Sequence, residues 1–202
     1  MSYLEVLAIQ TIVKSMFITS TEIENTPFLG DLCRSAGCLF VNRKSIWNLK
    51  NEVTSLEKAF LKGHSVTLFP EGTTTDGTFV LPFRSSLIQA AKNSRVEIVP
   101  IAVKFTKINY EPFSIINKDK VCWYSSMAFL PHLFNVCCLR TISLQLNFLP
   151  SRIIPLNGCR KKTTRLIQKE IKDVLDKREI KTLEVCQKYY SDRMIWPNLR
   201  RV

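Results

Sequence analysis

The chain has 202 residues, a length typical of one domain, and its hydrophobic fraction of 46% and charged fraction of 23% exclude a largely disordered protein. Basic residues exceed acidic residues by 12, which predicts an anionic partner such as phospholipid, nucleic acid or a phosphorylated substrate. Residues 157–202 carry 13 basic and 6 acidic side chains, which favours a surface-binding face near the C-terminus.

Hydrophobic periodicity predicts helices and strands in alternation along the chain. In chain order, it predicts a helix over residues 3–13, a strand over 37–41, a helix over 45–62, a strand over 65–69, a helix over 85–92, strands over 96–103 and 141–149, and a helix over 163–175. Residues 141–149 alternate between apolar and polar side chains, which indicates a half-buried antiparallel strand near the sheet edge. Together these elements predict a single α/β domain over residues 1–202, in which helices flank a mostly parallel β-sheet.

The longest stretch without a charged side chain runs from residue 121 to residue 139. Its length is close to that of a membrane-spanning helix, but it contains Ser125, Pro131, His132 and Asn135. We therefore expect it to be buried in the protein or to pack at an interface, and not to span a bilayer.

The seven cysteines form no Cys-x-x-Cys pair, and the start of the chain lacks the basic residues and cleavage site of a secretory signal. We therefore expect reduced thiols in a cytoplasmic setting. Only two histidines are present and neither lies near paired cysteines, so no metal site is expected.

The most informative stretch is a predicted strand that runs into a polar turn, Leu68-Phe69-Pro70-Glu71-Gly72-Thr73. Ligands of open α/β sheets bind beyond the carboxyl ends of the strands, where this turn places a carboxylate, a glycine and a hydroxyl. The alternative is a solvated turn in which Gly72 only supplies a positive φ. The residues alone leave both interpretations open.

Three blocks together resemble the lysophosphatidate and glycerol-phosphate acyltransferases. Residues 69–73 are similar to that family's Phe-Pro-Glu-Gly-Thr block, residues 37–43 to its earlier Gly-x-x-Phe-[Ile/Val]-x-Arg block, and residues 99–103 to its later Val-Pro-Val-[Ala/Ser]-[Ile/Val] block. The blocks occur in the family's order, and the resemblance covers roughly residues 1–180. It implies the family's α/β fold and an acceptor site formed by Arg43, Glu71, Gly72, Thr73, Thr74 and Arg84, with Gly37, Pro70 and Pro100 as structural residues beside it.

The resemblance also implies direct acyl transfer, in which a histidine takes the proton from the acceptor hydroxyl and an acidic residue orients that histidine. The family's signature is His-x-x-x-x-Asp at the start of a helix. Here Glu5 stands where the aspartate belongs, and the histidine would lie immediately before Met1, so the chain itself lacks it. The alternative for Glu5 is an ordinary first-turn glutamate favoured by the helix dipole. For His64 and His132 we expect structural roles.

Two explanations fit the missing histidine. In the first, the natural reading frame extends upstream of Met1 and supplies the N-terminal part that the family usually has. In the second, the product is a catalytically inactive lipid-binding homologue. A nucleic-acid-binding protein is a third interpretation of the basic charge, but the sequence contains no recognised nucleic-acid motif.

The residues after Glu-Gly-Thr bear on the identity of the acceptor. Members that act on lysophosphatidate commonly have an arginine there, whereas this chain has Thr-Thr-Asp at residues 74–76. Arg43 and Arg84 are the remaining candidates for the acceptor's anionic group, and each is alternatively a solvated surface charge. Residues 71–86 and 123–132 are similar to bacterial members that acylate lyso-ornithine lipid.

The predicted function is transfer of a fatty acyl group from acyl-CoA or acyl-carrier protein to the hydroxyl of a lysolipid, either lysophosphatidate or lyso-ornithine lipid. No metal, cofactor or nucleic-acid partner is expected. The protein is expected to bind peripherally to the cytoplasmic face of an anionic membrane, helped by a basic helical tail over residues 160–202. The sequence leaves open the acceptor, the acyl length, the donor carrier and the oligomeric state.

Overall fold

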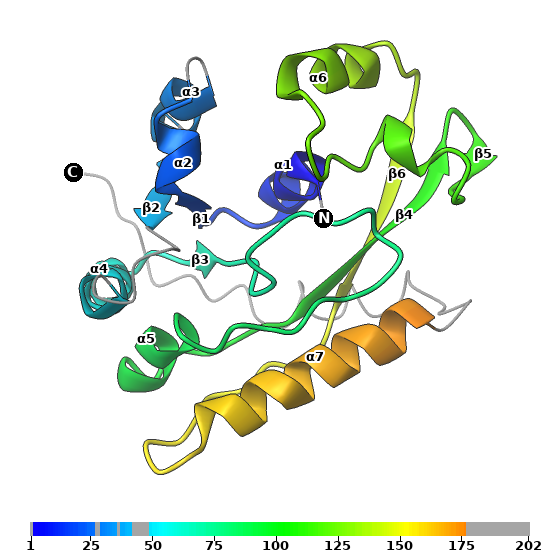
Figure 1. Cartoon of the computed structure of the whole chain (residues 1–202). Coiled ribbons are helices and arrows are strands. Elements are labelled where there is room, and N and C mark those ends of the chain that lie inside the picture. Colours follow the sequence, from blue (N-terminus) through cyan, green and yellow to red (C-terminus); the bar gives the residue numbers. More distant parts are fainter. Residues whose placement is uncertain (1, 27–28, 36, 42–48, 177–202) are drawn as a thin grey trace, which may run out of the picture.

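The computed structural model describes residues 2–26, 29–35, 37–41 and 49–176. Figure 1 shows short helices around two groups of strands, with one long helix along the side of the molecule. In chain order the elements are α1 (Tyr3–Ile12), β1 (Met16–Ser20), α2 (Thr21–Glu24), α3 (Leu29–Ser35), β2 (Leu39–Val41), α4 (Leu49–Leu61), β3 (Val66–Thr67), α5 (Ile88–Asn93), β4 (Ile101–Ile108), β5 (Glu111–Pro112), the 3₁₀ helix η1 (Lys118–Lys120), α6 (Phe129–Cys137), β6 (Ile142–Phe148) and α7 (Arg160–Asp176).

Two three-stranded sheets form the centre of the fold. In the first, β1 lies between β2 and β3 and pairs in parallel with both, with Ile18 opposite Leu39 and Met16 opposite Val66. In the second, β4 lies between β5 and β6 and is antiparallel to both. The α/β class and the parallel sheet predicted from the sequence are confirmed, although parallel pairing is confined to β1, β2 and β3.

The antiparallel pairing follows from the turn that joins β4 to β5. Asn109 and Tyr110 form this turn with positive φ angles of 48° and 70°. Two consecutive residues in this conformation match the twist of the strands on either side and reverse the chain within two residues. Strand β6 then pairs with the other side of β4, so it is the antiparallel edge strand that the alternation of residues 141–149 predicts.

Most predicted elements are present with shifted bounds, and strand β4 shows why. It begins at Ile101, whereas the sequence pattern predicts a strand from residue 96. Pro100 has no N–H to donate to a neighbouring strand, so regular pairing starts only after it. Before it, Ile98 makes a single antiparallel bridge with Arg152. The predicted start of helix α4 at Ser45 lies outside the described residues.

Strand β1 and the short helices α2 and α3 were not predicted from the sequence. Helix α3 ends in a Schellman motif, in which Gly37 N–H donates to Arg34 O at 3.0 Å and Cys38 N–H donates to Cys33 O at 3.0 Å. Gly37 has a φ of 69°, which a residue with a side chain rarely adopts. Gly37 therefore ends α3 and turns the chain into β2.

Two apolar clusters hold these elements together. The first joins the parallel sheet to α4 and α5 through the buried side chains of Ile18, Val41, Leu56 and Ala90. The second joins β4 to the segment after η1 through Phe105, Ile108, Val121 and Cys122. Leu4 of α1 packs against this second cluster, which fixes the first turn of α1 beside the antiparallel sheet.

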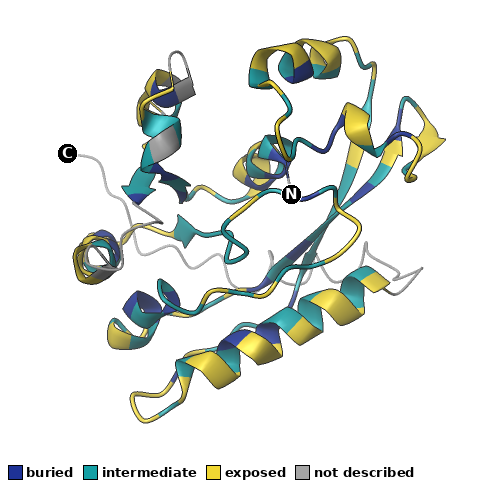
Figure 2. Ribbon diagram, viewed as in Figure 1, coloured by how far each residue is buried: buried dark blue, intermediate teal, exposed yellow. Residues whose placement is uncertain are grey.

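Helix α7 lies along the antiparallel sheet and is clearly amphipathic. In Figure 2 its side toward the strands is buried or intermediate, and its opposite side is exposed. Thr164 and Ile167 are its buried residues. The amphipathic helix predicted over residues 163–175 is therefore confirmed, and residues 177–202 of the predicted basic tail lie outside the described residues.

The uncharged segment 121–139 folds in two parts. Val121 and Cys122 are buried in the second cluster, and the chain then forms α6 at the molecular surface. Within the described part of the chain, no helix combines the length and the apolar character that crossing a bilayer would require.

Candidate functional site

A cavity of about 1090 Å³ lies between α1, the turn at residues 70–77, β4 and α7. Most of its lining is apolar and comes from several elements, including Ile9, Leu56, Phe69, Phe83, Ile101 and Ile171. Glu5 and Glu71 also line it, so two carboxyl groups face a largely hydrocarbon space. Such a cavity suits a long apolar ligand that carries a polar reacting group at one end.

Glu5 lies in the first turn of α1 and is only 7% exposed. Burial and the nearby carboxylate of Glu71 raise the pKa of Glu5 to about 7, whereas the N–H of Ser2 donates to its carboxylate and opposes this rise. The bond from Ser2 is half of a capping box, so Glu5 does serve the helix start. It does so while lining the cavity, and its role in orienting a histidine stays a prediction.

Glu71 follows strand β3 and holds the polar turn in place. Its Oε2 accepts a hydrogen bond of 2.9 Å from the N–H of Leu81. Burial raises its pKa, and the bond from Leu81 partly offsets that rise. Glu5 and Glu71, 66 positions apart in the sequence, therefore line the same cavity, and the charge of Glu71 contributes to the raised pKa of Glu5.

Arg84 lies directly over Gly72. A Cβ atom added to Gly72 would lie 3.1 Å from Nε and 3.2 Å from Cζ of Arg84. The backbone N–H of Arg84 also donates to Pro70 O at 2.8 Å, which ties residues 81–84 to the turn. The exposed guanidinium thus borders the turn that carries Glu71, where it is available to an anionic group of a ligand.

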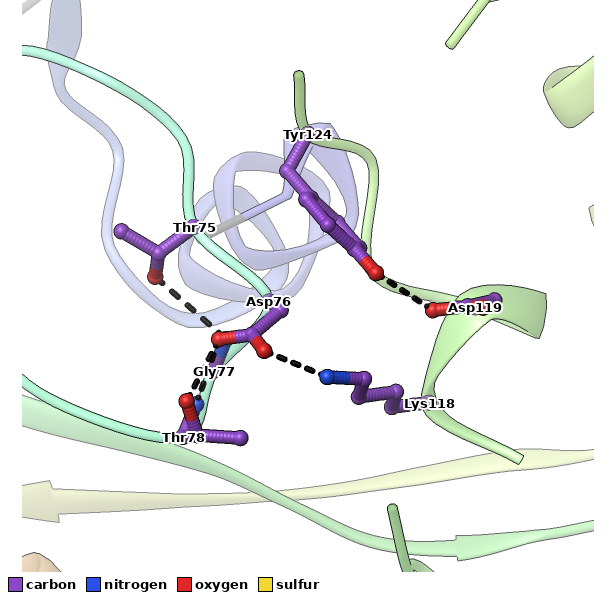
Figure 3. A network of polar contacts seen from close by, with 7 residues as sticks. All are labelled: Thr75, Asp76, Gly77, Thr78, Lys118, Asp119 and Tyr124. Atoms are coloured by element: carbon purple, nitrogen blue, oxygen red, sulfur yellow. Dashed lines mark hydrogen bonds and ion pairs between the residues drawn. The ribbon is translucent and has the colours of Figure 1, made fainter. Parts of the chain in front are cut away.

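A polar network ties the same turn to the segment around η1, as Figure 3 shows. Asp76 pairs with Lys118 and accepts two hydrogen bonds from Thr78, at 3.1 Å from its N–H and 2.6 Å from its hydroxyl. Lys118 lies 5.7 Å from the centre of the Tyr124 ring, and the Tyr124 hydroxyl donates to Asp119 at 2.7 Å. The sequence did not reveal this network, because Asp76 and Lys118 are 42 residues apart.

The network predicts a specific dependence of stability on pH. The hydrogen bond from Lys118, followed by those from Thr78, lowers the pKa of Asp76 to about 2. The ionised carboxylate therefore stabilises the folded state above its ordinary pKa of 3.8, and this contribution is lost as the pH falls towards 2. Asp76→Asn should lower the thermal midpoint at pH 6, and the difference from the parent protein should narrow between pH 4 and pH 2. An equal difference at both ends of this range would show that the charge is not involved.

The other predicted site residues differ in their exposure and in whether they line the cavity. Thr73 is exposed and Thr74 is partly exposed, both on the turn after Glu71. Pro70 lines the cavity, and so does the buried Pro100, whose carbonyl accepts a bond of 2.9 Å from Leu149 N–H. Arg43 lies outside the described residues, so its position relative to the turn stays a prediction.

The two histidines differ in their surroundings. His64 lines the cavity and is exposed, but it precedes β3 whereas Glu71 follows that strand. His132 is buried, and its Nδ1 lies 2.9 Å from the Tyr3 hydroxyl. Burial lowers the pKa of His132. Among the described residues, neither histidine is seen to contact Glu5, and no three His, Cys, Asp or Glu side chains gather as metal ligands.

Comparison with known proteins bears on this arrangement. The sequence profile of the family described as Acyltransferase matches residues 1–104. The chain belongs to this family. The matched region contains Glu5, Glu71, Gly72 and Arg84, that is, the carboxyl pair and the turn described above.

Curated relatives are similar to this chain over part of their length. A lyso-ornithine lipid O-acyltransferase of Rhizobium meliloti is 26% identical over 184 residues, which cover 88% of this chain and 63% of the relative. A second enzyme of that name from Rhodobacter capsulatus is 30% identical, over 66% of this chain and 48% of the relative. A 1-acyl-sn-glycerol-3-phosphate acyltransferase of Neisseria gonorrhoeae is 30% identical over 52% of this chain and 41% of its own. The chain thus spans less than two thirds of each of these relatives.

The fold is also that of a solved acyltransferase. The crystal structure of the 1-acyl-sn-glycerophosphate acyltransferase of Thermotoga maritima superposes with a TM-score of 0.50 at 14% sequence identity, covering 89% of this chain and 65% of that one. This likeness supports the fold prediction made from the three sequence blocks.

Proposed function

We propose that this acyltransferase moves a fatty acyl group from an acyl thioester to the hydroxyl of a lysolipid. The observation that carries this proposal is the apolar cavity with Glu5 and Glu71 in its lining and Arg84 over the adjoining turn. An acyl chain is a long apolar ligand that fits such a cavity. A lysolipid brings the anionic or zwitterionic headgroup that an arginine recognises.

The chemistry requires a base for the acceptor hydroxyl. In the proposed reaction an imidazole beside Glu5 takes the hydroxyl proton, the oxygen attacks the thioester carbonyl, and the carbon–sulfur bond breaks as the thiol leaves with a proton. Glu5 would orient this imidazole and stabilise its charged form. A cation beside Glu5 would also lower the pKa of its carboxyl from about 7, so that the ionised form predominates during turnover.

The relatives' names favour two acceptor classes. Lyso-ornithine lipid and lysophosphatidate both present an anionic group near the acceptor hydroxyl, and we assign this group to Arg84 together with Arg43. The donor is proposed to be acyl-CoA or acyl-carrier protein. The basic surface of the chain suits either of these anionic donors and an anionic membrane to which the enzyme would bind peripherally, on its cytoplasmic face.

An acyl-transfer assay tests the proposal directly. The 202-residue chain is compared with the same chain carrying one histidine immediately before Met1, using radiolabelled acyl-CoA and acyl-carrier protein with each of the two lysolipids. The added histidine should raise the rate by about 10²- to 10⁴-fold. Robust turnover without it, surviving His64→Ala and His132→Ala, would show that the base is assigned wrongly.

A second candidate function is that of a lipid-binding homologue, which would use the same apolar cavity. A homologue without its base would bind lysolipid and acyl thioester without transferring the acyl group. In that case the chain would bind both ligands in a calorimetric titration, and adding the histidine would produce no acylated lipid.

Arg43→Ala is expected to raise the acceptor KM and to lower kcat/KM for the acceptor by about 10- to 150-fold. This range corresponds to the loss of one charge-assisted hydrogen bond of about 1.5–3 kcal/mol. The measurement is initial rate against acceptor concentration, and Arg95→Ala, at an exposed position after α5, is the matched control. Unchanged acceptor dependence would make Arg43 an ordinary surface charge.

A further inference from the structure

Helix α6 carries large apolar side chains on both its inner and its outer side. Its inner side packs on the protein through Phe129, His132, Leu133 and Val136 at helical spacing. Its outer side presents Leu130, 62% exposed, and Phe134, 71% exposed, one turn apart. Figure 2 shows that most of the helix is exposed. The helix thus turns large apolar side chains outward, as an amphipathic helix in water does not.

No charge interrupts this surface. The segment from residue 121 to residue 139 contains no charged side chain, whereas Lys120 directly precedes it and Arg140 follows it. Before Lys120, Asp119 accepts a hydrogen bond from the Tyr124 hydroxyl, and Lys118 is paired with Asp76. Lys120 and Arg140 are exposed. An apolar middle with basic ends is the pattern of a helix that lies in a lipid interface, because long basic side chains reach the headgroups while the middle is buried.

Helix α1 extends the same kind of surface. Its Tyr3 ring packs edge-on against Phe129, with 5.3 Å between ring centres, and against Trp123, with 6.4 Å between ring centres. One turn after Tyr3, on the same side of α1, Leu7 is 58% exposed. Glu5 is the only charged side chain between residues 2 and 13, and it is buried.

We propose that the outer face of α6, centred on Leu130 and Phe134, inserts into the lipid surface that contains the lysolipid acceptor. This inference rests on the proposed function, because a lipid acceptor requires its enzyme to work at a membrane. The basic ends of the segment and the net charge of +12 favour an anionic lipid surface over a second copy of this basic chain. The contact through Tyr3 then holds the first turn of α1, and with it Glu5, next to the membrane-bound helix.

The double variant Leu130→Glu/Phe134→Glu tests the proposal, since both side chains point away from the core and the fold should persist. Flotation with vesicles of phosphatidylcholine and phosphatidylglycerol should show a partition coefficient at least about tenfold lower than that of the parent chain. The parent should stay partly bound in 1 M salt, whereas the variant should be released. Leu61→Glu, at an 85% exposed leucine at the end of α4, is the matched control and should bind as the parent does.

The outcomes separate this proposal from the function on which it rests. In the histidine-bearing chain, the double variant should lose activity toward acceptor in vesicles and keep activity toward a short-chain acceptor dissolved as monomers. Vesicle binding through α6 without any acyl transfer would contradict the proposed function but support α6 as the membrane-docking surface. Equal binding of variant and parent would overturn the docking surface. The docking surface would also be overturned if the double variant sedimented as a monomer, the parent sedimented as a dimer, and both bound vesicles equally. This face would then be an interface between copies of the chain.

Discussion

Replacing Glu5 with glutamine is expected to stabilise the protein at pH 8 by roughly 3 kcal/mol while impairing acyl transfer. The pKa of this carboxyl is about 7 in the folded chain against an ordinary value of 4.5. Between these values the folded state binds more protons than the unfolded state, so the free energy of unfolding falls as the pH rises. Above pH 7 the cost of burying the ionised carboxylate is fully present, and glutamine removes it.

The measurement is urea unfolding of both proteins at pH 4 and pH 8. At pH 4, where the carboxyl is protonated in the folded protein and mostly so in the unfolded chain, the two free energies of unfolding should be similar. Glutamine can still accept the bond from Ser2 N–H, so the helix cap is retained. Glu111→Gln, at an exposed residue of β5, is the matched control. A stabilisation of equal size at both pH values would point to packing and not to charge.

The second part of the prediction concerns the acyl-transfer activity of Glu5→Gln. In the histidine-bearing chain, Glu5→Gln should lower kcat/KM by about 10²- to 10⁴-fold, because an uncharged partner no longer stabilises the imidazolium. Glu5→Asp keeps the charge and should retain most of the activity. A residue that only capped α1 would give neither this difference nor an altered pH profile. Residues that cost stability and serve activity are typical of functional sites.

Periodicity was informative where one face of an element is buried. Helices α4 and α7 and strand β6 were predicted because their apolar residues recur at the spacing that their burial requires. Strand β1 was missed although it is central to the parallel sheet, because its residues, Met-Phe-Ile-Thr-Ser, do not alternate between apolar and polar side chains. The start of β4 was predicted too early, because the apolar run continues through Pro100 although hydrogen bonding does not.

The candidate site was predictable only in part. The turn after β3 could be found, because an apolar strand that ends in Pro-Glu-Gly-Thr is a local pattern. The meeting of Glu5 and Glu71 in one cavity and the ion pair of Asp76 with Lys118 depend on the packing of distant segments, and no local pattern contains them. The position of Arg84 over Gly72 likewise depends on how residues 73–83 loop back to the turn.

Gly72→Ala is expected to affect both stability and acceptor binding. Gly72 has a φ of 73°, and a residue with a side chain in this conformation costs roughly 1–2 kcal/mol. Its new Cβ would also lie 3.1 Å from Arg84 Nε, so the guanidinium must shift by a few tenths of an ångström. If Arg84 holds the acceptor's anionic group, kcat/KM for the acceptor should fall, mainly through KM, by no more than the roughly 10- to 150-fold expected for losing the whole contact.

Gly63→Ala separates the two effects. Gly63 has a φ of 78°, so its backbone cost is similar, but a Cβ there would meet no atom within 4 Å. Both variants should therefore lose a similar free energy of unfolding in urea, and only Gly72→Ala should raise the acceptor KM in the histidine-bearing chain. Arg84→Ala should reproduce that rise without the loss of stability, because its side chain is exposed. If Gly72→Ala and Gly63→Ala change KM equally, Arg84 is not a contact of the acceptor, and the anionic group must be bound elsewhere around the turn.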